Sequence, residues 1–305
     1  MTKRNYLFFI IGMSALVGTV IAIQTGIGNK NSVENQTSHD VQNNTNVSGS
    51  SSLKQPYSLA FFLNIDNPYY ETNLEIFIKN LKKGDYLLVS GPPERAKEII
   101  QKTHEIQNLV NSGVNVFSVM NYKKISDIVA TVPTLPKGVD YVMYDYEGGN
   151  GYSPEFTTDE NQSIVYFDKA HSAVEMYNKN TGSHAKLFVT PPYGQLHKLD
   201  WNWDSVVTNM DVVDMQLQAF LKDPSLKNYT INIMQQIHKT SPDKLVFIQL
   251  SITPKRGTVL DNVSAIDNLK NVSGIGAFLI FYQNTQSSDL KQFFNIIQRD
   301  NFTGS

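Results

Sequence analysis

From residue 57 onward, short apolar runs alternate with amphipathic runs, and eight of each can be distinguished. The short runs are nearly continuous in apolar and aromatic residues, which is typical of parallel strands buried on both faces. Gly and Pro residues separate them from the longer runs. We expect strands at 57–65, 85–90, 114–120, 139–146, 185–190, 212–220, 244–252 and 275–282. We expect helices at 70–81, 94–111, 124–132, 163–180, 229–239, 261–272 and 288–299, with only a short one inside 195–209.

Eight strand–helix pairs over roughly 245 residues match the size of a (β/α)8 TIM barrel. The structural alternative is a doubly wound open sheet. The chain has no GxGxxG after its first strand and no Walker motif, so the nucleotide-binding forms of that sheet lack their fingerprint. We therefore predict an α/β protein with a TIM barrel at residues 56–305.

The N-terminus carries an apolar run from Tyr6 to Ile23, preceded by Lys3 and Arg4. This pattern predicts a helix that enters a membrane with its basic end inside. Its 18 residues fall between a long signal-peptide core and a short spanning helix, and no clear cleavage motif follows. We favour an uncleaved anchor at 1–23, with a cleaved signal as the alternative. Both interpretations place the remaining chain outside the cytoplasmic membrane.

Residues 24–55 are rich in Asn, Ser, Thr and Gln and nearly lack large apolar side chains. Such a segment cannot bury enough surface to offset its ordering entropy, so we predict a disordered linker. Glycosylation sequons lie in it and in the barrel region, at Asn35, Asn43, Asn46, Asn161, Asn228, Asn262, Asn271 and Asn301. Export would make the protein a glycoprotein in hosts with the machinery, whereas an Asn-rich composition also creates sequons by chance.

Composition excludes several classes of function. The net charge is −2 and no large basic face is evident, so we expect no nucleic-acid partner. There is no cysteine, which excludes disulfides, thiolate metal sites and cysteine nucleophiles. The six histidines are scattered, without an HExxH or HxH pair. We therefore expect no metal site and no cofactor.

Two acids lie at the predicted end of the fourth strand, where a barrel builds its active site. Asp145 and Glu147 are two residues apart, so their side chains share one face. The neighbouring carboxylate and partial burial would raise the pKa of Glu147, which suits a general acid. The seventh strand carries Gln249 and no acid, so the usual pair of catalytic carboxylates is incomplete.

Amides and aromatic rings gather at the other strand ends. Asp214, Gln216 and Gln218 alternate and would share one face, where a ligand or a self-satisfied interior network could use them. Aromatic faces together with amides suit sugars. The candidate substrate-binding residues are Gln216, Gln218, Gln249, Tyr193, Tyr282 and Trp201, the last beside Trp203. We expect Tyr144 and Tyr146 to pack outward against helices.

The segment from Asp140 to Glu147 (DYVMYDYE) resembles the DxxDxDxE signature of family 18 glycoside hydrolases, the chitinases and related endo-N-acetylglucosaminidases. Met143 stands where the pattern has another aspartate. The resemblance implies a TIM barrel in which Glu147 protonates the glycosidic oxygen. It also implies that the acetamido group of the substrate is the nucleophile, held by Asp145.

The chain departs from this family at two further strands. On the sixth strand, the family's Met-x-Tyr-Asp becomes Met215-Gln-Leu217-Gln218. On the eighth strand, Phe281-Tyr282 occupies the region of the usual tryptophan. These departures allow a divergent hydrolase or a barrel that binds sugar without cleaving it.

Two hypotheses follow. The first is a membrane-tethered, extracellular glycoside hydrolase-like domain that acts on N-acetylated glycan with Glu147 as acid and Asp145 as partner. The second is a non-catalytic surface barrel that binds glycan or a protein. Hydrolysis by a metal at these two acids lacks histidine support. An open cleft at Glu147 with Gln216 and Gln218 nearby favours the first hypothesis. A salt bridge from Arg256 or a lysine to Glu147, or a Glu147 side chain that points to a helix, contradicts it.

Overall fold

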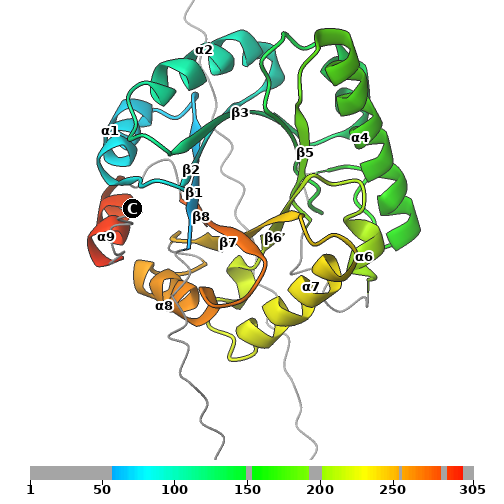
Figure 1. Cartoon of the computed structure of the whole chain (residues 1–305). Coiled ribbons are helices and arrows are strands. Elements are labelled where there is room, and N and C mark those ends of the chain that lie inside the picture. Colours follow the sequence, from blue (N-terminus) through cyan, green and yellow to red (C-terminus); the bar gives the residue numbers. More distant parts are fainter. Residues whose placement is uncertain (1–56, 149–152, 192–200, 254–255, 283–286, 298–305) are drawn as a thin grey trace, which may run out of the picture. The chain divides into compact units, whose positions relative to one another are not determined.

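The computed structural model describes residues 57–297 except 149–152, 192–200, 254–255 and 283–286. Eight parallel strands pair in chain order and close into a barrel with the helices outside (Figure 1). The strands are β1 (Leu59–Asn64), β2 (Tyr86–Gly91), β3 (Asn115–Tyr122), β4 (Tyr141–Tyr144), β5 (Lys186–Val189), β6 (Val212–Gln216), β7 (Leu245–Ser251) and β8 (Ile275–Phe281). The helices are α1 (Tyr70–Asn80), α2 (Ala96–Gln107), α3 (Ile125–Thr131), α4 (Glu160–Thr181), α6 (Trp203–Val206), α7 (Leu226–Thr240), α8 (Val259–Leu269) and α9 (Ser287–Ile296).

This architecture confirms the predicted TIM barrel. Closure is direct, because Leu59 of β1 pairs with Phe278 of β8, and the open-sheet alternative is therefore wrong. The short helix expected inside 195–209 is α6. The largest difference at a strand end lies at the sixth strand, which ends at Gln216 instead of 220. Leu217 leaves the extended region with φ −96° and ψ 11°, and a 3-10 turn, η3 (Gln218–Phe220), follows.

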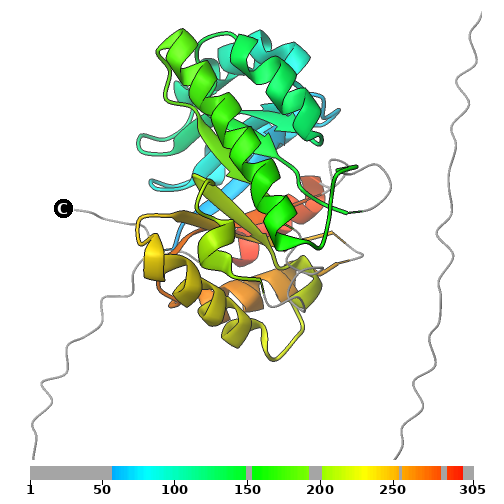
Figure 2. The ribbon, with the colours of Figure 1, turned by 90° about the vertical axis from the view of Figure 1, so that its right-hand side faces the viewer.

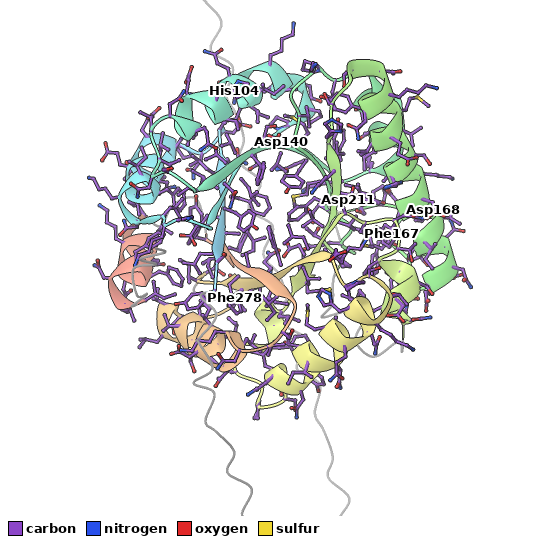
Figure 3. All side chains as sticks on the ribbon, in the orientation of Figure 1. His104, Asp140, Phe167, Asp168, Asp211 and Phe278 are labelled. Atoms are coloured by element: carbon purple, nitrogen blue, oxygen red, sulfur yellow. The ribbon has the colours of Figure 1, made fainter. Side chains whose placement is uncertain are left out.

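A repeated hydrogen-bonding pattern links the amino ends of neighbouring strands. An aspartate just before an even-numbered strand accepts the backbone N–H of the preceding strand. Asp85 accepts from Leu59 at 2.9 Å, and Asp211 accepts from Leu187 at 2.7 Å. Asp140, labelled with Asp211 in Figure 3, accepts from both the backbone N–H and the hydroxyl of Ser118, each at 2.8 Å. The first acid of the family-like segment therefore braces the barrel.

Side chains fill the barrel interior (Figure 3), and its amino-terminal half is an aromatic layer. Phe188 lies 6.0 Å from Tyr141 and 5.7 Å from Phe247, measured between ring centroids at near-perpendicular angles. Phe117 and Tyr86 extend the layer, at 5.1 Å from Tyr141 and 5.2 Å from Phe247. A TIM barrel is a packed core and not a pore, so a ligand site must form at the carboxyl ends of the strands.

The alternating residues of β4 pack outward against α4, the long helix that crosses the outside of the barrel in Figure 2. Tyr144 and Tyr146 are fully buried there and contact Phe167 at 6.2 and 5.0 Å between ring centroids. The prediction that both tyrosines face helices is confirmed. Since side chains alternate along a strand, Asp145 and Glu147 are directed to the barrel interior.

The predicted anchor at 1–23 and the linker at 24–55 lie outside the described residues, so these boundaries stay predictions. In the described part of the chain, no helix combines the length and apolarity that a membrane crossing requires.

The structure shows whether one of the predicted glycosylation sequons is accessible. Asn262 is fully buried, and its amide donates to the carbonyl oxygens of Ser251 and Thr258, which leaves it inaccessible to glycosylation in the folded barrel.

Candidate active site

A cavity of about 490 Å³ opens at the carboxyl ends of the strands. This volume is within the usual range of small-ligand sites. Two carboxylates, two cations and several amides share the lining with apolar and aromatic side chains. The lining residues are Phe62, Asn64, Ser90, Asn121, Lys123, Met143, Asp145, Glu147, Gln216, Gln218, Gln249, Arg256, Ile280, Phe281 and Tyr282.

The backbone after β4 aims both acids into this cavity. The N–H of Asp145 donates to the carbonyl oxygen of Tyr122 at 2.8 Å, so the strand register with β3 continues past Tyr144. Ser153 then fastens the turn: its hydroxyl donates to the carbonyl oxygen of Asp145 at 2.6 Å and its N–H to that of Glu147 at 3.0 Å. The backbone hydrogen bonds therefore direct the side chains of Asp145 and Glu147 into the cavity.

Glu147 is partly buried and receives a hydrogen bond on Oε1 from the side-chain amide of Gln216. Burial raises the pKa of Glu147 above its usual range, and the charge of Asp145 raises it further. The Gln216 hydrogen bond and the charges of Arg256 and Lys123 oppose this rise. Burial raises the pKa of Glu147 more than the like charge of Asp145 does, and a carboxyl group with a raised pKa suits proton donation.

Asp145 is held by a different partner. The hydroxyl of Thr190, the residue after β5, donates to Oδ1 of Asp145 at 3.1 Å. Burial raises the pKa of Asp145, while this hydrogen bond and the charge of Lys123 lower it. Two neighbouring carboxyl groups with separate partners can therefore carry different protonation states, which is the usual basis for dividing acid and stabilising roles.

Arg256 lines the cavity and is exposed, but it does not lock Glu147. No ion pair joins these two side chains, and Arg256 acts on Glu147 only through its longer-range field. Among the described residues no ion pair of Glu147 with Arg256 or a lysine is seen, and Glu147 lines the cavity instead of facing a helix.

The structure brings four of the predicted binding residues to the acids. Gln216, Gln218, Gln249 and Tyr282 all line the cavity, although Gln218 reaches it from the turn η3 and not from the strand. Tyr282 is 6% exposed and donates its hydroxyl to the carbonyl oxygen of Phe62 at 2.8 Å. It offers the ligand a small part of its ring.

A fifth predicted binding residue, Trp201, packs away from the cavity lining. Trp201 is 4% exposed, packs on Trp203 at 6.1 Å between ring centroids, and donates its indole N–H to Thr158 at 3.3 Å. It is not among the described residues that line the cavity. Tyr193 lies outside the described residues.

Sequence reasoning did not name Lys123. It considered Arg256 only as a salt-bridge partner of Glu147, and it treated Asp214 as one of three polar residues on a shared face. Lys123 follows β3 and Arg256 follows β7, and their only sequence signal is a cation shortly after a strand end. Asp214, midway along β6, is fully buried. In the described residues, no three Asp, Glu or His side chains converge as metal ligands do.

No protein-family model and no curated protein matches the chain. Similar solved structures include a family 18 chitinase from Pseudoalteromonas aurantia, with a TM-score of 0.50 and 12% identity over 79% of this chain and 100% of that one. Another is the catalytic domain of a family 18 chitinase from the fern Peteris ryukyuensis, at 0.47 and 12% over 77% and 97%. A third is an oxaloacetate acetylhydrolase, at 0.45 and 9% over 77% of both chains.

The chain shares its fold with family 18 chitinases. Identities this low show the fold alone, because one barrel architecture carries many unrelated chemistries. The resemblance that residues 140–147 suggest therefore holds for the architecture, a glycoside hydrolase-like barrel. Any argument about activity rests on the site itself.

Proposed function

We propose that this barrel is a glycoside hydrolase that cleaves N-acetylated glycan with a single glutamate and with help from the substrate. The observation that carries the proposal is the placement of Asp145 and Glu147. They are the only acids among the described residues that line the cavity, and both have a raised pKa. A double displacement needs a second carboxylate on the other side of the sugar, whereas substrate assistance does not.

In the proposed reaction, protonated Glu147 donates its proton to the glycosidic oxygen as the bond to the anomeric carbon breaks. The acetamido oxygen of the substrate bonds to that carbon, and Asp145 accepts a hydrogen bond from the acetamido N–H. Glu147, now a carboxylate, removes a proton from water, whose oxygen attacks the anomeric carbon and releases the acetamido group. Glu147 ends the cycle protonated, so atoms and charges balance.

The rest of the cavity fits a sugar. The amides of Gln216, Gln218 and Gln249 can donate to and accept from hydroxyl and acetamido groups. Phe62 and Phe281 supply apolar surface for the C–H face of a pyranose ring. The ligand would thus be held by side chains from the carboxyl ends of β1, β6, β7 and β8.

A non-catalytic glycan- or protein-binding barrel is the second candidate. Gln216 already occupies Oε1 of Glu147, a contact that a sugar oxygen would have to displace or share. Leu217, Gln218 and Met143 also stand where the resembling family carries tyrosine and acids. Under this alternative the cavity binds its ligand and leaves the glycosidic bond intact.

We further propose that the barrel works outside the cytoplasmic membrane. The support is the apolar run at 6–23 with its basic flank, followed by a polar tether. An uncleaved run would anchor the protein at the cell surface, and a cleaved one would release it.

The test is turnover of an oligosaccharide panel by the full chain and by Glu147→Gln. We expect cleavage of N-acetylated members by the natural chain and its loss in E147Q, with ligand binding retained. Gln249→Ala is a matched control, because it removes a lining amide without touching Glu147, and it should weaken binding while turnover persists. Binding without cleavage by the natural chain would support the second candidate. Equal turnover by E147Q would remove Glu147 from the mechanism.

A further inference from the structure

Asp214 of β6 is a buried acid in the described part of the barrel interior that the proposed reaction does not use. Its side chain is fully buried in the middle of β6, and neither carboxyl oxygen has a hydrogen-bond partner among the described residues. An unpaired carboxylate in such surroundings is strongly disfavoured. Burial raises the pKa of Asp214 well above its usual range, and the charges of Asp145 and Glu147 raise it further. The group is therefore a neutral acid with an O–H that needs an acceptor.

The strand register places Asp214 beside the site. Tyr144 of β4 pairs with Val189 of β5, which pairs with Val213 of β6. One residue further along each strand are Asp145, Thr190 and Asp214, whose side chains face the interior by alternation. Thr190 donates to Asp145 at 3.1 Å, so Asp214 lies on the other side of this threonine in the same row.

Few groups around Asp214 can accept a hydrogen bond from its protonated carboxyl group. Across β7 its register partner is Phe247, followed on the same face by the neutral Gln249, and β5 offers Phe188 and Thr190. The charges that act on Asp214 are those of Asp145 and Glu147. Lys123 acts on both of these acids, and Arg256 acts on Glu147.

Asp145 is the better acceptor of the two. Oε1 of Glu147 already accepts from Gln216, whereas Oδ2 of Asp145 accepts from no described group. On β4 itself, the interior residue next to Asp145 is Met143, which has no polar hydrogen to give. The donor must therefore come from another strand.

We propose that Asp214 is a positioning residue whose protonated carboxyl group donates a hydrogen bond to Asp145 through one buried water. β6 thus supplies to Asp145 the donor that β4 lacks at Met143. The hydrogen bond keeps Asp145 ionised and turned toward the cavity. Its catalytic meaning, holding the acetamido group of the substrate, rests on the proposed function, but the hydrogen bond itself does not.

The test uses two variants and a readout that is independent of turnover. Asp214→Asn keeps a neutral donor of the same shape, and Asp214→Leu keeps similar bulk without a donor. Carboxyl ¹³C NMR titration of the full chain in detergent follows Asp145 and Asp214 individually. We expect the titration midpoint of Asp214 to lie above that of an ordinary aspartate, because burial disfavours its charged form. We expect the midpoint of Asp145 to rise in D214L, because a donor to its charged form is lost, and to stay near the natural value in D214N.

A fall of the Asp145 titration midpoint in D214L would overturn the proposal. If Asp214 were ionised, both variants would remove a negative charge and lower the midpoint of Asp145. An unchanged midpoint in D214L would reduce Asp214 to a space-filling role. Should D214L not fold, titration of Asp214 in the natural chain decides, since an acidic midpoint contradicts the proposal. Each outcome can be obtained on a barrel that cleaves no glycan, so failure of the proposed function is distinguishable.

Discussion

The side-chain amide of Gln216 donates to Oε1 of Glu147, and this contact joins the end of β6 to the end of β4 across the mouth of the barrel. It stabilises the ionised form of Glu147 and so works against the burial that raises the pKa of this acid. A general acid must carry its proton at the pH of the reaction. The contact therefore lowers the upper pH limit of the proposed activity.

Gln216→Leu should move that limit upward. Without the amide, burial and the charge of Asp145 act on Glu147 with less opposition, so its pKa rises and the protonated fraction persists to higher pH. The measurement is kcat/KM against pH, in which the basic limb should shift to higher pH. Gln249→Leu removes another lining amide that does not contact Glu147, and its basic limb should coincide with that of the natural chain. A shift to lower pH in Q216L would contradict the assignment.

Arg256→Gln should also shift the basic limb of kcat/KM to higher pH, by less than Gln216→Leu does. Arg256 is exposed and forms no ion pair with Glu147, so its field is screened by salt. We expect the basic limb to rise in R256Q at low ionic strength and the difference to vanish at about 1 M salt, where the Debye length is about 3 Å. Lys222→Gln is the control, because Lys222 pairs with Asp261, at 3.3 Å. An equal shift in both variants would assign the effect to net charge alone.

Asp214 should make the stability of the barrel depend on pH. Its pKa is raised in the folded state, so the folded protein binds more protons than the unfolded chain above pH 4, and stability falls as pH rises through this interval. Replacement by asparagine removes this dependence. Urea unfolding should show D214N gaining on the natural chain by up to about 1.4 kcal/mol per pH unit above pH 4.

The control for this comparison is Asp289→Asn, an acid in the first turn of α9 and away from the cavity lining. The pH dependence that D214N shows beyond that of D289N is the part that belongs to the buried carboxyl group of Asp214. A D214N curve that ran parallel to that of the natural chain would mean that Asp214 is ionised in the folded state.

Phe188→Ala should destabilise the barrel strongly. Phe188 is fully buried at the centre of the aromatic layer, with Tyr141, Phe247 and Phe62 around it at 6.0, 5.7 and 6.1 Å. Truncation of a core phenylalanine costs about 3–5 kcal/mol, and urea unfolding measures it. Leu260→Ala, at a side chain that is 63% exposed, should change stability by less than about 0.5 kcal/mol. Similar losses in both variants would contradict the packed interior.

The fold was predictable from the sequence because each strand is a short apolar run between breakers, a signal that is local. The end of β6 was not, since the apolar pattern continues through Leu217 while the backbone turns there. The turn is supported by a hydrogen bond from the N–H of Leu217 to the carbonyl oxygen of Gln249, which only the folded barrel provides.

The site was predictable where one strand carries the information, as for Asp145 and Glu147. The parts of the site that depend on contacts between different strands were not predictable. The partner of Glu147 is 69 positions away at Gln216, and that of Asp145 is 45 positions away at Thr190. Asp214 looked like one more polar residue in an alternating run, and its isolation becomes visible only when the barrel closes around it. Trp201 resembled a sugar platform but is buried against Trp203.

The central claim is that the acetamido group of the substrate completes a site that has a single catalytic glutamate. The most direct measurement compares turnover of an N-acetylated oligosaccharide with that of the same oligosaccharide after removal of its acetyl groups, using the full chain. The account predicts cleavage of the first and none of the second, because the free amine has no carbonyl oxygen to bond to the anomeric carbon. Equal cleavage of both would contradict the account and require a second protein carboxylate or another nucleophile.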